Sequence, residues 1–478
     1  MRPVITLIII LLFSQSLYAQ DCTCKELLDS AIIKTESNYA GYQHKINARN
    51  RASYNNFKKG LLSVADRTSF LDCYDILNRY VKYFNDGHLF ISEFPRATAA
   101  QSDSLAKTHP RYVTQGTPVA KQPDQIEGVW QNAKEQLEIV RITDKKFYAV
   151  IKKTTTARWQ EGMIKMEITK GQNNKYSILF YNPDFTFSRF SDIGIFKRLL
   201  LGFGSNKYVK LEENDPEMNY IHVNKPEQPF FKVIDKDNVL LTVPSSLISQ
   251  YIVDSILMKN KNLIVSAKNF ILDLRSNTGG NYMWNGIQML ANTKPYLDKK
   301  DPTKDDFLML ASLDNAAYFE NFKNFVNGDT AGIGYYTRLT NKIKNNLGAT
   351  IGFSFYSARP SDTSQQTILP NPKNVAIIID KGVASAAEAV INSLKSSSTK
   401  VIVYGENSHG MIDYVNVNTI RLKFIGNKRY YFGYPTFYSP DMLKNPINPT
   451  GIKPDVYIPN KVRNWIEWVI DDLKKKKG

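Results

Sequence analysis

The sequence predicts an α/β core with a mostly parallel sheet, preceded by an N-terminal helical segment and a small antiparallel β domain. Three different hydrophobic patterns along the chain lead to this prediction. Before residue 90, apolar residues recur every three or four positions, as on one face of a helix. Between 126 and 223 they alternate with polar residues, as in half-buried strands. From 233 onward strand-like runs alternate with helical stretches, which is typical of parallel sheets.

Residues 1–19 are predicted to be a secretory signal peptide. Arg2 is followed by an apolar run from Val4 to Phe13 and then by the small residue Ala19, which is the layout of a cleavable leader. The run is shorter than the about 20 apolar residues that span a bilayer. We therefore expect an exported protein, periplasmic or extracellular, with no stable membrane anchor once the signal is removed.

Residues 20–96 are predicted to form the N-terminal helical segment. One apolar stripe at helical spacing is made by Tyr74, Leu77, Val81 and Phe84. It stops at Asp86 and Gly87, which favour a turn. Residues 97–124 are polar and contain three prolines, so we expect a linker there.

Residues 125–230 are predicted to form the small antiparallel β domain, for which no ligand can be named. Residues 231–460 are predicted to form the core, interrupted by a long insertion at 296–370. The end of the chain, 461–478, is predicted to be an amphipathic helix and a solvated basic tail.

The three cysteines, Cys22, Cys24 and Cys73, cannot all pair within one chain. In an exported protein we expect one disulfide, from either Cys22 or Cys24 to Cys73. A zinc site is less favoured, because only one CxC occurs and no second ligand pair follows at metal spacing.

The formal net charge of +17 raises the possibility of a nucleic-acid partner. The lysines are spread along the whole chain, however, and no basic helix or patch with interleaved aromatic residues stands out. We therefore expect a cationic surface and no nucleic-acid partner.

A glycine pair follows the apolar strand in "FILDLRSNTGGN". At Gly279 and Gly280 the backbone could approach a substrate and direct N–H groups at an oxygen atom. The alternative interpretation is a plain glycine turn between a strand and a helix.

Ser385 lies where the strand in "IIIDKGVASAAEAVINSL" gives way to a helix. A serine there is usually a helix cap. The flanking alanines leave room for a substrate carbonyl, and the helix N-terminus offers free N–H groups, including that of Ala386. Ser385 is therefore also a candidate nucleophile.

A serine nucleophile needs a base. The chain has five histidines, and His88 is the best placed, because the tight Asp86–Gly87 turn presents it at the end of a helix. For the other four, a structural or exposed role is expected. These four are His44, His109, His222 and His409.

The core contains four motifs in sequence: "NFILDLRSNTGGN", "VAIIIDKGVASAAEAVINSL", "VIVYGENSHG" and "GIKPDVYIP", with "YFNDGH" upstream. In order and spacing they resemble the C-terminal processing (tail-specific) serine peptidases, a family that includes tricorn protease and the repeats of interphotoreceptor retinoid-binding protein. The resemblance covers about residues 235–460 and implies a ClpP/crotonase-like core.

The resemblance also distinguishes two branches of the family by their base. In the Ser-Lys branch a lysine follows the glycine that ends a segment like "GENSHG"; here Met411 follows Gly410 and cannot take a proton. In the tricorn-like branch the base is a histidine in an upstream motif like "DGH", which His88 matches.

Carried over residue by residue, the resemblance makes Ser385 the nucleophile and His88 the general base. Backbone N–H groups of Gly279 or Gly280 and of Ala386 would form the oxyanion hole. Glu388 matches a family glutamate and is given an orienting or structural role.

Three departures from the family pattern remain. Gly87 stands where tricorn protease has a serine, and Asn448 where it has a glutamate, so the group that orients His88 is left open. The candidates for that group are Asp86, Glu406 and Ser408. No PDZ module precedes the core, and the period-two region occupies its place, so a preference for substrate C-termini is not expected.

These observations together predict a secreted or periplasmic serine endopeptidase that cleaves polypeptides through an acyl-enzyme with a Ser-His centre. No metal or organic cofactor is expected. The alternative is a non-catalytic peptide- or ligand-binding protein on the same scaffold. An α/β esterase is disfavoured, because Ser385 lies in "VASAA" and not in GxSxG. Substrate specificity and oligomeric state are not indicated.

Overall fold

The computed structural model describes most of the chain from residue 23 to residue 476. The gaps within that range are residues 70–71, 94–96, 114–121, 197–199, 204–205, 212–227, 282–284, 292, 294–304, 327, 356–367, 426–427 and 460. The predicted signal peptide, Cys22 and His222 therefore lie outside the described residues. In the described part of the chain no helix is both long and apolar enough to cross a membrane.

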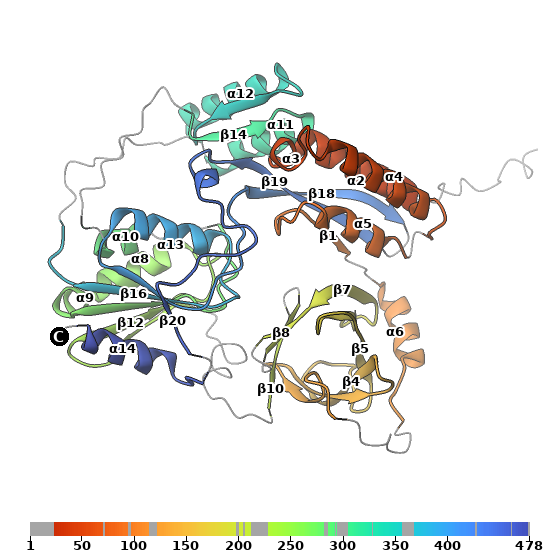
Figure 1. Cartoon of the computed structure of the whole chain (residues 1–478), viewed down its shortest axis with the longest axis horizontal. Coiled ribbons are helices and arrows are strands. Elements are labelled where there is room, and N and C mark those ends of the chain that lie inside the picture. Colours follow the sequence, from red (N-terminus) through yellow and green to blue (C-terminus); the bar gives the residue numbers. More distant parts are fainter. Residues whose placement is uncertain are drawn as a thin grey trace, which may run out of the picture.

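A six-stranded sheet forms the centre of the core (Figure 1). Its order is β11-β12-β13-β16-β17-β20. The strands are β11 (Phe230–Val233), β12 (Asn238–Thr242), β13 (Asn269–Asp273), β16 (Asn374–Ile379), β17 (Val401–Gly405) and β20 (Val456–Tyr457). β11 pairs antiparallel with β12, and the other neighbours pair in parallel. Every residue of β12 and β13 is buried, which explains their continuous apolar runs.

Helices cover both faces of this sheet. One face packs against α8 (Gln250–Lys259), α10 (Asn285–Ala291) and α13 (Ala386–Ser397), and the short α9 (Lys261–Ser266) follows α8. The other face packs against α14 (Trp465–Lys475), whose Trp465 and Val469 contact a second apolar cluster. The helix predicted for 461–478 is therefore present. The ClpP/crotonase-like description of the core stays a prediction.

A nine-stranded antiparallel sheet forms a separate layer, as the period-two pattern predicted, and Figure 1 shows it curling around its apolar interior. Its order is β7-β6-β5-β4-β3-β2-β10-β9-β8. The strands are β2 (Gly128–Gln131), β3 (Glu135–Arg141), β4 (Lys146–Thr154), β5 (Ile164–Lys170), β6 (Tyr176–Tyr181), β7 (Phe187–Ile193), β8 (Ile195–Phe196), β9 (Leu200–Phe203) and β10 (Asn206–Lys210). We call this unit the β domain.

The prediction of a linker at 97–124 is wrong for part of that range. Helix α6 (Ala99–Thr108) lies within it and begins with a capping box between Thr98 and Gln101. A threonine followed three residues later by a glutamine is a recognised helix start. The polar composition and the prolines concealed this signal. The predicted domain boundaries themselves stay a prediction.

A third sheet, which the sequence did not predict, unites three distant parts of the chain. Its order is β1-β19-β14-β15, and β18 pairs with β19 on the other side. The strands are β1 (Phe90–Glu93), β14 (Phe307–Leu310), β15 (Thr350–Phe353), β18 (Val415–Ile425) and β19 (Lys428–Tyr438). The insertion supplies β14 and β15 together with α11 (Leu313–Glu320), η3 (Asn321–Phe325) and α12 (Thr330–Lys344).

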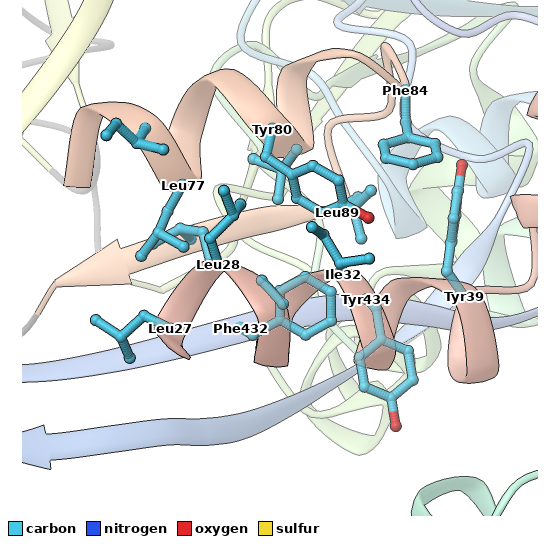
Figure 2. Close-up of a cluster of buried hydrophobic side chains, with 14 of the residues drawn as sticks. Leu27, Leu28, Ile32, Tyr39, Leu77, Tyr80, Phe84, Leu89, Phe432 and Tyr434 are labelled. Atoms are coloured by element: carbon cyan, nitrogen blue, oxygen red, sulfur yellow. The ribbon is translucent and has the colours of Figure 1, made fainter. Parts of the chain in front are cut away.

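The predicted N-terminal helices pack on this third sheet. They are α2 (Cys24–Asn38), α3 (Tyr42–Lys45), α4 (Arg51–Ala65) and α5 (Cys73–Lys82). Figure 2 shows Leu28 and Ile32 of α2 and Tyr80 of α5 in one cluster with Phe432 and Tyr434 of β19. This cluster fixes α5, and with it the turn that follows α5, against the hairpin of β18 and β19.

A disulfide joins Cys24 to Cys73, with 5.2 Å between the Cα atoms. The expected bridge to Cys73 is therefore confirmed, and Cys24 is the partner. It ties the start of α2 to the start of α5.

We expect removal of this disulfide to lower the free energy of unfolding by about 4 kcal/mol, because it closes a long loop in the unfolded chain. Denaturant unfolding of Cys73→Ser would measure the loss. Cys22→Ser is the matched control and is expected to unfold like the wild type. Equal midpoints for Cys73→Ser and wild type would contradict the prediction.

Candidate active site

Ser385 lies in the sharp turn between β16 and α13. Its backbone angles are φ 54° and ψ −122°, whereas a capping serine has an extended backbone with negative φ. A non-glycine residue in this region is strained, and such strain is concentrated at functional sites. The conformation therefore favours the nucleophile interpretation over the simple helix cap.

His88 comes within hydrogen-bonding distance of Ser385, although the two are 297 residues apart in sequence. Its Nε2 lies 3.1 Å from Ser385 Oγ, and its Nδ1 lies 2.8 Å from the main-chain carbonyl oxygen of Tyr414. A carbonyl can only accept a hydrogen bond, so Nδ1 carries the proton of the neutral ring. The lone pair of Nε2 is then free to accept the Ser385 hydroxyl proton.

The carbonyl of Tyr414 is thus the group that orients the His88 ring, and it was not among the three candidates. Asp86 acts on the backbone of the turn: its Oδ1 accepts the His88 N–H at 3.0 Å, and its Oδ2 accepts the Tyr39 hydroxyl at 2.7 Å. Ser408 donates to Glu388, and Glu406 donates its main-chain N–H to Ile379.

Burial dominates the electrostatics of this turn. It raises the pKa of Asp86, an effect that the neighbouring His88 opposes. Burial, and then the charge of Asp86, raise the pKa of Tyr39 well above its usual value. The Tyr39 hydroxyl therefore stays protonated and remains a donor to Asp86.

Asn448, which stands where an acid was expected, holds the backbone just before Tyr414. Its Oδ1 accepts N–H groups from Ile412 at 3.0 Å and Asp413 at 3.2 Å. In return, the carboxylate of Asp413 accepts the N–H groups of Ile447 at 2.8 Å and Asn448 at 3.1 Å. Asn448 therefore acts on His88 indirectly, because it holds the backbone that positions the carbonyl of Tyr414.

Glu388 is fully buried and ties the turn of Ser385 to the loop 408–411. One carboxylate oxygen accepts the Ser408 hydroxyl at 2.5 Å and the Gly410 N–H at 2.6 Å. The other accepts the N–H groups of Ser385 and Met411, both at 2.9 Å. These four donors give Glu388 a positioning function.

Gly87 and Met411 are packed against each other, and the small residue makes room for the large one. A Cβ atom at position 87 would lie 3.0 Å from both Cγ and Cε of Met411. Glycine at 87 therefore leaves room for the Met411 side chain between the loop 408–411 and the turn that carries His88.

In the Gly279–Gly280 pair, Gly279 lies directly against Ser385, and Gly280 lies against the backbone of Ser246. Both glycines have positive φ, and a Cβ atom at Gly279 would lie 2.7 Å from Ser385 Cβ. Gly279 N–H donates to Asn277 Oδ1 at 3.0 Å. Within the described residues no acceptor pairs with the N–H of Gly280 or of Ala386. Of the predicted oxyanion donors, Gly280 and Ala386 are therefore the available ones.

The other described histidines have structural contacts. His44 packs against Tyr438, and His109 hydrogen-bonds the carbonyl of Ile164 through Nε2 at 2.7 Å. His409 donates its main-chain N–H to Val383, and burial and Lys381 lower the pKa of its ring. In the described part of the chain no group of three or more His, Cys, Asp or Glu side chains could hold a metal ion.

Residues 241–458 match the model of peptidase family S41. No curated protein matches the chain. Among solved structures the chain is similar to mature CPAF (12% identity, 95% of this chain and 97% of that chain, TM-score 0.46). It is also similar to the photosystem II D1 C-terminal processing protease (10% identity, 92% of this chain and 95% of that chain, TM-score 0.36). A further similar structure is tricorn protease (13% identity, 95% of this chain and 37% of that chain, TM-score 0.38).

The family match confirms the resemblance inferred from the motifs. It includes Gly279, Gly280, Ser385 and Glu388 and leaves His88 upstream. The turn of Ser385, the candidate nucleophile, and His88, the candidate base, thus come from different parts of the chain.

Replacing Glu388 with glutamine is expected to lower the free energy of unfolding by about 2–3 kcal/mol, because an amide NH₂ would face N–H donors in a buried site. Chemical denaturation would measure the loss. Glu320→Gln, at an exposed ion pair with Lys323, is the control and should change the value by less than about 0.5 kcal/mol. Equal effects of the two variants would contradict the positioning function.

Proposed function

We propose that this protein is a serine endopeptidase with Ser385 as nucleophile and His88 as general base, because residues 241–458 match the model of peptidase family S41. The observation that carries the proposal is the 3.1 Å contact between His88 Nε2 and Ser385 Oγ. The Ser-Lys alternative has no lysine at the position of Met411.

In the first step His88 Nε2 takes the hydroxyl proton as Ser385 Oγ attacks the carbonyl carbon of the scissile peptide bond. The N–H groups of Gly280 and Ala386 would stabilise the oxyanion that forms. His88 then gives the proton to the leaving amine, and an ester remains on Ser385. A water molecule, activated by the same nitrogen, hydrolyses this acyl-enzyme and restores Ser385.

Two groups would support the imidazolium that forms during each step. The carbonyl of Tyr414 keeps its hydrogen bond from Nδ1, so the ring holds its orientation while Nε2 gains and loses the proton. Asp86 lies close enough to interact electrostatically with His88. A carbonyl oriented by Asn448 thus takes the position in which a Ser-His-Asp triad has a carboxylate.

The substrates would be polypeptides, and the site of action the periplasm or the extracellular space. The signal-like residues 1–19 support export, and the Cys24–Cys73 disulfide fits an oxidising compartment. The chemistry assigned here uses only side chains and backbone groups of the chain and needs no metal or organic cofactor.

Purified wild-type protein is expected to react with a fluorophosphonate probe and to cleave an unfolded protein at pH 7 to 8, because such probes react with activated serines. Ser385→Ala should lose both activities, and His88→Ala should lower the rate of cleavage by about 10²–10⁴-fold. Probe labelling and peptide release by mass spectrometry would measure these effects.

Ser393→Ala is the matched control, because Ser393 lies on the same helix and its hydroxyl contacts Gln288. It should label and cleave like wild type. Cleavage by Ser385→Ala would contradict the assignment of the nucleophile. If wild type neither labels nor cleaves, the non-catalytic peptide- or ligand-binding function replaces the peptidase.

A further inference from the structure

Lys207 of the β domain contacts one of the loops that form the candidate site. Lys207, on β10, donates from Nζ to the main-chain carbonyl oxygen of Ser276 at 3.3 Å. Burial of the ammonium lowers the pKa of Lys207, an effect that the negative charge of Asp380 opposes. A partly buried lysine that points out of one unit into the loops of another is unlike the solvated lysines of the surface.

The contact falls where the two catalytic loops meet. Ser276, with φ 60°, lies three residues before Gly279, and Asp380 lies five residues before Ser385. The buried carboxylate of Asp380 accepts the N–H groups of Ser276 at 2.8 Å and Gly382 at 2.9 Å. A displacement of Ser276 would therefore be transmitted to both loops.

Tight packing strengthens this link. A Cβ atom at Gly382 would lie 3.0 Å from the Cα atom of Ser276, so the backbones of the two loops are in contact. Lys207 thus supplies a donor and a positive charge at the junction between the glycine pair and the nucleophile turn.

A second strand of the β domain, β7, contacts the segment that carries the candidate base. Ser191, on β7, accepts hydrogen bonds from Asn78 at 2.6 Å and Lys82 at 3.2 Å, both on α5. Arg189 forms an ion pair with Asp72 at 3.4 Å. Figure 1 shows β7 facing α5 and β10 on the side of the domain nearer the core. The α5 contact is polar and borders a pocket of about 590 Å³.

We infer that the β domain acts as a bracket, that is, as a rigid unit that contacts both the loops near Ser385 and the helix before His88. Lys207 is the positioning residue at the core end, and Ser191 makes the contact at the α5 end. This inference rests on the proposed function. Lys207 holds the carbonyl of Ser276, and through it the loop that presents the N–H of Gly280. Ser191 holds α5, and through it the turn that presents His88.

The principal test compares Lys207→Met with Lys210→Met. Lys210 lies on the same strand, and its Nζ donates to Gln125 within the β domain and lies near the Trp130 ring. Lys207→Met should lower kcat by about tenfold with little change in KM. The substitution would displace the loop that presents the N–H of Gly280 but would leave the residues that bind the rest of the substrate in place. Lys207→Arg, which keeps a cationic donor, should recover part of that loss. Lys210→Met should keep the wild-type kcat.

Hydrogen exchange provides a second measurement that does not depend on activity. Lys207→Met should increase exchange in residues 274–281 and 380–385, and Lys210→Met should not. If wild type proves inactive, the proposed function fails, whereas this measurement still decides whether Lys207 holds the loops. Equal exchange in the two variants, or equal losses of kcat, would overturn the inference.

The double variant Lys207→Met/Ser191→Ala tests the bracket itself. If both contacts act through one rigid domain, either substitution alone frees the domain. The fold-loss of kcat in the double variant should then be smaller than the product of the fold-losses in the two single variants. Strictly multiplicative losses would show two independent contacts and would overturn the bracket.

Discussion

The site depends on the hydrogen bond between His88 Nδ1 and the carbonyl of Tyr414, and the third sheet makes that bond possible. β1 begins two residues after His88 and pairs with β19, and β18 begins directly after Tyr414 and pairs with the same strand. The histidine and the carbonyl are therefore held next to two strands, β1 and β18, that both pair with β19 in one sheet. Gly433 shows how closely these strands fit, because a Cβ atom there would lie 2.3 Å from the ring of Phe90. The N-terminal helices and the disulfide stabilise the same arrangement from the other side.

A carbonyl and a carboxylate differ in what they give to a catalytic histidine. Both fix the tautomer, but a hydrogen bond to a charged acceptor contributes about 1.5–3 kcal/mol, against about 0.5–1.5 kcal/mol for a neutral one. In the proposed mechanism the charge of Asp86 would make up part of the difference, while its oxygens hold the Tyr39 hydroxyl and the His88 backbone. Orientation and charge are thus supplied to His88 by two separate groups, where a triad uses one.

The site residues that could be predicted from the sequence are those whose function depends on the type of side chain. Ser385, His88, Glu388 and the glycine pair each lie in a short motif, and the structure brings them together. The carbonyl of Tyr414 could not be predicted, because every residue has a carbonyl and only the fold selects one. Lys207 is one cation among many, and its partner is again a carbonyl.

The same reason explains which parts of the fold were predictable. The core strands and the β domain could be predicted from the spacing of their apolar residues, because that spacing is visible within a short segment of the sequence. The third sheet does not, because its strands come from the N-terminal segment, the insertion and the core. Its pairing is set by tertiary contacts that have no local signal. Helix α6 is different, since its capping box was visible in the sequence.

Glu388 shows why a buried acid beside the proposed nucleophile need not take part in the chemistry. A carboxylate removed from water is costly unless its oxygens are satisfied, and here four donors satisfy them. With both oxygens occupied, the acid serves as a fixed point between the nucleophile turn and the loop 408–411. That loop ends at Met411, whose side chain packs on Gly87 beside His88. A continuous path therefore runs from the backbone of Ser385 through Glu388 and Met411 to the turn of the base, independently of the third sheet. The distance between His88 and Ser385 is thus determined twice, once by strand pairing and once by a buried carboxylate.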